Sequence, residues 1–103
     1  MSIPVGLRNL LDVYKLVNNS KCSFSEAFKE IAAKGRISEA AIRLACMRDN
    51  GVNTQELAYY LDPGNSEPFK AHLSKRYPAH QDFIHKFIDD VLSKDINHSN
   101  DSA

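Results

Sequence analysis

Apolar residues recur at helical spacing along most of the chain, and no stretch alternates apolar and polar residues as a half-buried strand would. Short polar breaks, several of them containing Gly, Asn or Pro, divide this pattern into segments. We expect helices over about 5–17, 23–35, 38–48, 53–61, 66–76 and 79–93. The sequence therefore predicts an all-α fold, a compact bundle of about six short helices.

Local signals set several of the expected helix ends. Ser23 and Asn53 are each followed three residues later by a glutamate, the pattern of a reciprocal capping box. Gly35 is the expected stop of the second helix, and Asn50-Gly51 is the expected stop of the third. The third segment is apolar on nearly every side, so we expect it to be a central, buried helix. Its apolar residues are Ala40, Ala41, Ile42, Leu44, Ala45, Cys46 and Met47.

The length of 103 residues suits one domain, expected over 1–94, followed by a disordered polar tail over 95–103. Thirteen basic and 13 acidic residues give a formal net charge of zero, so any binding to a polyanion must come from a local patch. No apolar run approaches the roughly 20 residues of a membrane span. No secretory signal is visible at the N-terminus, and two cysteines make no disulfide framework. We therefore expect a cytoplasmic protein with no membrane contact.

Catalytic and metal-binding patterns are absent from the sequence. The four histidines and two cysteines show no ligand spacing, and the four glycines form no phosphate-binding loop. No nucleophile, base and orienting acid can be assembled from the pattern. We expect no enzymatic activity, no metal and no cofactor. Cys46 is expected in the core, Cys22 in a loop, and His72 half-buried.

A helix-turn-helix is predicted over 54–77. Its first helix would hold Leu57 and Leu61, with the small Ala58 where the two helices cross. A polar turn over 62–65 would follow, and the second helix would be anchored by an apolar face of Phe69, Leu73 and Tyr77. The outward residues of the second helix are short or basic, as a helix in a major groove requires. Phosphates would be neutralised by Lys70, Lys75 and Arg76; base edges would be approached by Asn65, Ser66, Glu67 and Ala71; Arg36 and Arg43 complete the predicted DNA-binding set.

The spacing Leu57-Ala58-x-x-Leu61, followed by Phe69, Leu73 and Tyr77, resembles the second helix-turn-helix of AraC-type transcriptional regulators. The resemblance covers about 36–84 and implies a DNA-binding regulator in which the apolar 38–48 segment corresponds to a buried connecting helix. It departs from the family at Asp62 and Pro78, where the family usually has Gly. A second placement of the motif, as in phage-repressor-like folds, runs over 28–47 with Gly35 in the turn. That placement ranks lower, because its second helix would be the nearly all-apolar one.

Charge is segregated along the chain. Basic residues exceed acidic ones by three over 21–48, and acidic residues exceed basic ones by three over 81–103. This is the distribution that a DNA-facing side and a DNA-averted side would produce. The residues counted in the first stretch are the basic Lys21, Lys29, Lys34, Arg36, Arg43 and Arg48 and the acidic Glu26, Glu30 and Glu39. Those counted in the second stretch are the acidic Asp82, Asp89, Asp90, Asp95 and Asp101 and the basic Lys86 and Lys94.

The last helix carries a broad apolar stripe, which either closes the core or forms a dimer or partner interface. The interface residues would be Phe83, Phe87, Ile88, Val91 and Leu92. The leading prediction is a small transcriptional regulator that binds double-stranded DNA as a homodimer. The alternative is a helical protein-interaction module (an adaptor, antitoxin-like partner or inhibitor) that uses this stripe with Tyr59 or Tyr60. A six-helix signalling bundle of the death-domain kind is a third hypothesis.

Overall fold

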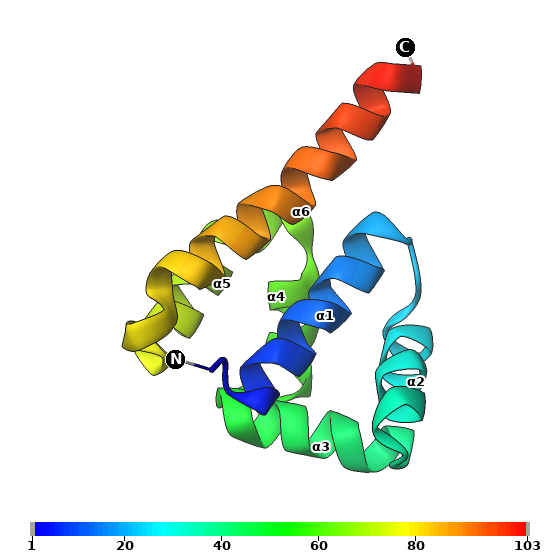
Figure 1. Ribbon diagram of the computed structural model, residues 1–103, viewed down its shortest axis with the longest axis vertical. Helices are drawn as coiled ribbons and strands as arrows, with labels where there is room; N and C mark the ends of the chain where they lie inside the picture. The colour runs from blue at the N-terminus through cyan, green and yellow to red at the C-terminus, as the bar shows by residue number, and fades with distance from the viewer. Residues whose placement is uncertain (1, 103) are drawn as a thin grey trace.

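The computed structural model describes the backbone of residues 2–102 and the side chains of residues 2–94. Over this range the chain forms helices and turns and no strand, which confirms the all-α prediction (Figure 1). No helix in the described part of the chain is long and apolar enough to cross a membrane. The expected helix end at 93 differs from the structure, in which the backbone of α6 continues through Ser102; the side chains of 95–103 are not described, and the predicted disorder of this tail stays a prediction. The helices are α1 (Val5–Asn19), α2 (Phe24–Gly35), α3 (Glu39–Asn50), α4 (Thr54–Leu61), α5 (Ser66–Arg76) and α6 (Gln81–Ser102), with 3-10 turns at Pro63–Asn65 and Pro78–His80.

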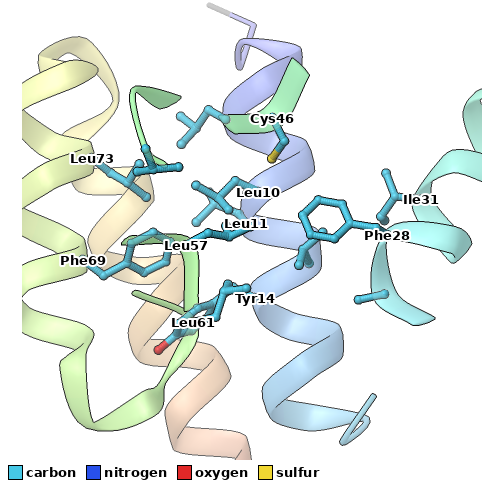
Figure 2. Packing of buried hydrophobic residues seen from close by; sticks show 14 of the residues in the cluster. Leu10, Leu11, Tyr14, Phe28, Ile31, Cys46, Leu57, Leu61, Phe69 and Leu73 are labelled. Carbon is cyan, nitrogen blue, oxygen red and sulfur yellow. The ribbon is translucent and has the colours of Figure 1, made fainter. Parts of the chain in front are cut away.

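Helix α1 occupies the centre of the fold. It packs against α2, α3, α4 and α6, and apolar side chains on several of its sides are fully covered. Figure 2 shows Leu10, Leu11 and Tyr14 of α1 between Phe28 of α2 and Phe69 of α5. Each of these side chains is at most 1% exposed. One core therefore runs through the whole bundle, and α1 divides its α2–α3 side from its α4–α5–α6 side.

The prediction that 38–48 is the central, buried helix is wrong. α3 lies at the edge of the fold, where it packs chiefly on α1 and α2 (Figure 1). It buries only Ile42, Cys46 and Asn50, whereas Leu44 is 64% exposed. The sequence pattern misled because three of the seven apolar residues are alanines, which count as apolar but have little area to bury. The larger apolar side chains of α1 fill the centre instead.

The predicted capping boxes are both present. Ser23 Oγ accepts from the Glu26 amide at 3.2 Å, and Asn53 Oδ1 accepts from the Glu56 amide at 2.8 Å. Each glutamate in turn accepts from the backbone amide of its capping residue. α3 ends as predicted on Gly51 in the left-handed region, with φ 63°. α2 extends through Gly35, and the left-handed residue that ends it is Arg36, with φ 57°.

Candidate functional site

The α4–α5 pair was the predicted helix-turn-helix, and its apolar anchors lie as expected. Leu57 and Leu61 are buried, as are Phe69 and Leu73 on α5, and Tyr77 is half-buried. Ala58 does not lie at the helix crossing; it is exposed.

The contact between α4 and α5 is made by a bulky side chain. The Tyr60 ring stacks on Phe69, with centroids 5.6 Å apart, and on His72, with centroids 5.1 Å apart. The neighbouring Tyr59 is 49% exposed, so only one of the two adjacent tyrosines faces inward. Because an aromatic ring fills the space between these helices, they do not approach closely through a small residue.

The prediction that Lys70 points outward is wrong. Lys70 is 8% exposed, and its ammonium donates to Glu67 on α5 and to Asp89 on α6. The hydrogen bond to the Asp89 carboxylate raises the pKa of Lys70 above its usual value. Two carboxylates of the same chain, both largely exposed, therefore pair with this cation, and its charge is not presented to a ligand.

Arg76, a second predicted phosphate contact, is turned back onto α3. Its Nε donates to the Asp49 carbonyl at 2.7 Å, and its Nη2 donates to the Arg48 carbonyl at 3.4 Å. Arg76 thus caps the last carbonyls of α3, which attract a cation at a helix C-terminus. His72 Nε2 lies 2.7 Å from the Asn50 carbonyl, so the same end of α3 is held by two side chains of α5.

The rest of the predicted reading surface on α5 carries little positive charge. Lys75 and Ala71 are exposed, but so is Glu67. Asn65 is partly buried, and its amide donates to the Tyr59 carbonyl at 2.9 Å. Ser66 is also partly buried. The polar side chains of α5 thus bind other helices of this protein: Lys70 binds α6, and His72 and Arg76 bind the end of α3.

The α2–α3 pair has a tighter connection. Three residues, Arg36 to Ser38, join the helices, and Ile37 donates its amide to the Ala32 carbonyl at 3.1 Å. Ser38 Oγ then accepts from the Ala41 amide at 3.1 Å and caps α3. Ala32, 3% exposed, supplies a small buried residue just before the turn. The pair thus has a small buried residue, a left-handed turn residue and a capped second helix.

The outer face of α3 is open to solvent. Ala40, Ala41 and Arg48 are exposed with Leu44, and Ile37 at the start of the helix is 47% exposed. A depression of about 500 Å³ lies beside this face, between the start of α2 and α3. It is lined by Ser25, Glu39, Ala40, Arg43 and Leu44.

The two predicted DNA contacts from the middle of the chain, Arg36 and Arg43, lie on this pair. Arg36 is exposed in the turn. Arg43 is half-exposed, and two contacts hold its side chain. Arg43 Nη2 donates a hydrogen bond to Glu39 at 2.7 Å, and the Arg43 guanidinium lies 5.2 Å from the ring centroid of Phe28. Ser25 Oγ also donates to Glu39, at 2.8 Å. Arg43 therefore organises the surface beside α3 and is already paired with an acid.

Only part of the predicted interface stripe on α6 is accessible to a partner, because two of its five residues are buried in the core. Ile88 and Val91 are at most 3% exposed in the core of this chain and cannot reach a partner without unfolding. They are buried because α6 closes the core against α1 and α5. Phe83 remains 37% exposed, and Phe87 and Leu92 are partly exposed.

The buried cysteine and the histidine and acidic side chains were compared with what a reactive thiol or a metal site requires. Burial raises the pKa of the Cys46 thiol to about 12, so this thiol stays protonated in the core, where it was predicted. Among the described residues, no three histidine, cysteine or acidic side chains are grouped to hold a metal ion. Comparison of the chain with known protein families, curated proteins and solved structures finds no match.

Proposed function

We propose that this protein is a small DNA-binding regulator that places α3, the second helix of the α2–α3 pair, in the major groove of double-stranded DNA. The observation that carries the proposal is the exposed outer face of α3 directly after a three-residue turn. The sequence placed the reading helix at 66–76 and ranked the 28–47 placement lower, because its second helix would be the nearly all-apolar one. α3 lies at the edge of the fold, however, and several of those apolar residues are exposed to solvent.

The charge distribution supports this location. Over α2, the turn and α3 (24–50), five basic residues exceed four acidic ones by one, and Lys21 lies just before α2, whereas the acidic residues Asp82, Asp89 and Asp90 lie on α6. Arg36 and Arg48 are exposed before and near the end of α3, where they would contact phosphates on either side of the groove. Phosphate contacts supply most of the non-specific affinity for DNA, so α2–α3 is the pair suited to a polyanion.

A homodimer is the second part of the proposal. Two or three phosphate contacts from one copy give weak binding at cellular salt, and a symmetric dimer doubles them. Phe83, Phe87 and Leu92 form the apolar part of α6 that the core leaves uncovered. Sedimentation of the purified protein tests this directly, and a monomer that binds DNA one copy at a time would contradict it.

The proposed DNA interface is tested by titrating labelled random-sequence duplex DNA from about 50 to 200 mM salt, where phosphate contacts weaken steeply. Arg36→Ala with Arg48→Ala should weaken binding to all sequences and reduce the salt slope by about 2. The matched control, Lys75→Ala with Lys86→Ala, removes the same charge from α5 and α6 and should leave binding nearly unchanged. Equal losses in both variants, or no binding at about 50 mM salt, would contradict the proposal.

A protein-interaction module is the second candidate. The exposed Leu44 and Ile37 favour it, because neighbouring apolar side chains on a surface often mark a site for another protein. Such a partner would bury Leu44 without a strong dependence on salt. A complex that resists high salt and is lost in Leu44→Asp would favour this function over DNA binding.

A further inference from the structure

We infer that α3 recognises DNA through the methyl groups of the major groove, chiefly those of thymine, and not through the hydrogen-bonding edges of guanine or adenine. This inference rests on the proposed DNA-binding function. It concerns the outward side chains of the first two turns of α3, which are Ala40, Ala41 and Leu44. None of the three carries a hydrogen-bond donor or acceptor, so they cannot make the two-pronged contacts that identify guanine or adenine.

The arginine within this part of α3 is not free to replace them. Arg43 is held by Glu39 at 2.7 Å and lies over the Phe28 ring. To reach a base, its guanidinium would have to leave both a carboxylate and an aromatic face. Arg48 is exposed but lies in the last turn of the helix. The centre of the outer face is therefore apolar.

The major groove offers one apolar group, the methyl at C5 of thymine, and Ala is among the side chains that contact it. Short side chains at 40 and 41 let the helix backbone come close to the base pairs. Leu44, 64% exposed, then has an uncovered apolar side chain directed away from the fold. Covering it with a methyl removes apolar surface from water on both sides, which favours binding by roughly 3- to 4-fold per methyl.

The two exposed arginines fit this placement. α3 has 12 residues and is about 18 Å long, whereas the major groove is about 12 Å wide. A helix lying in the groove therefore reaches both phosphate walls near its ends. Arg36 and Arg48 lie at those ends and would fix the register, while the apolar centre meets the bases.

The test uses two pairs of duplex polymers that differ by one methyl at the same position. Poly(dA-dT) is compared with poly(dA-dU), and poly(dG-dC) with its 5-methylcytosine form. We expect the methyl-bearing member of each pair to bind roughly 3-fold or more tightly at fixed salt. Leu44→Ala and Leu44→Gln should bring both ratios toward one while keeping the salt dependence. Because Leu44 is largely exposed, both variants should fold, which their circular dichroism and melting curves verify.

Val5→Ala is the matched control, since it truncates an exposed apolar side chain on α1, outside both proposed interfaces, and should leave both ratios unchanged. Ratios near one in the unmodified protein, with salt-sensitive binding intact, would overturn the methyl inference and leave the proposed function standing. Absence of binding to all four polymers would overturn the proposed function itself. A methyl preference that persists undiminished in Leu44→Gln would show that Leu44 makes no methyl contact and would overturn the inference.

Discussion

The two helix pairs of this protein, α2–α3 and α4–α5, have similar connections and different surfaces. Each has two helices joined by three or four residues, and each begins with a capping box. In α4–α5, two cations of the second helix are paired within the chain: Lys70 donates to Asp89 on α6, and Arg76 donates to carbonyls at the end of α3. In α2–α3, the outer face of the second helix is exposed, and none of the described residues covers it (Figure 1).

This difference follows from position in the chain. α5 lies between α4 and α6 and also touches the end of α3, so its polar residues find partners within the protein. α3 packs chiefly on α1 and α2, which both lie on its inner side. A helix-turn-helix pattern therefore identifies a connection, whereas the surface presented by its second helix depends on what the later chain covers.

The largest expected effect is at Asn50, which joins the two pairs. Its side chain is fully buried; Nδ2 donates to the Gly6 carbonyl at 3.0 Å, and Oδ1 accepts from the Tyr77 hydroxyl at 3.0 Å. Asn50→Ala leaves these groups without their partner, so we expect the free energy of unfolding in urea to fall by about 3 kcal/mol. Asn65→Ala is the control. It loses one exposed bond, to the Tyr59 carbonyl, and should cost less than about 1 kcal/mol. Equal losses would show that Asn50 is not the junction between the pairs.

The sequence predicts those features that depend on near neighbours. The capping boxes at Ser23 and Asn53 and the left-handed Gly51 each involve residues within three or four positions, and all are confirmed. The surroundings of Lys70 could not be predicted in this way, because Asp89 lies 19 residues further on and reaches it only through the packing of α6 on α5.

The sequence did not point to the proposed site on α3, for a different reason. Counting apolar residues treats three alanines as equal to leucines, and so the pattern predicted a buried helix where the structure has an exposed one. The basic surplus over 21–48 and the short break at 35–38 were the signals that could have located it. An estimate of burial weighted by side-chain area would have ranked 38–48 as less buried, and the charge surplus and the short break would then have favoured this helix pair.

The next largest effects on stability are expected at the C-terminal ends of α2 and α3. Arg36 and Gly51 both adopt the left-handed conformation, which costs a residue with a side chain about 1 kcal/mol or more. Arg36→Gly should therefore raise the free energy of unfolding by about 0.5–1 kcal/mol while weakening DNA binding. Gly51→Ala should lower stability by about 1 kcal/mol or more, since its Cβ would also lie 2.8 Å from Arg76 Nη1. Urea unfolding and DNA titration separate the two effects. A gain in stability with unchanged DNA binding would remove Arg36 from the interface.

The smallest effect on stability is expected at Lys70, the cation of α5 that is paired with carboxylates of the same chain. Lys70→Met keeps the buried stem and removes a pair whose carboxylates are largely exposed, so stability at neutral pH should fall by less than about 1 kcal/mol. DNA binding should not change.

The pH dependence of this loss identifies its source. Hydrogen bonding to Asp89 raises the pKa of Lys70 in the folded state above its usual value of 10.5. The stabilisation is therefore complete below about pH 10.5, where lysine is protonated in both states, and disappears as the pH rises through the higher folded pKa. Urea unfolding of both proteins should give a constant difference from about pH 7 to 9 and a smaller one above about 10.5. A difference that does not change at high pH would mean that the charge of Lys70 is not the source of the stabilisation. A loss of DNA binding in Lys70→Met would return the reading surface to α5.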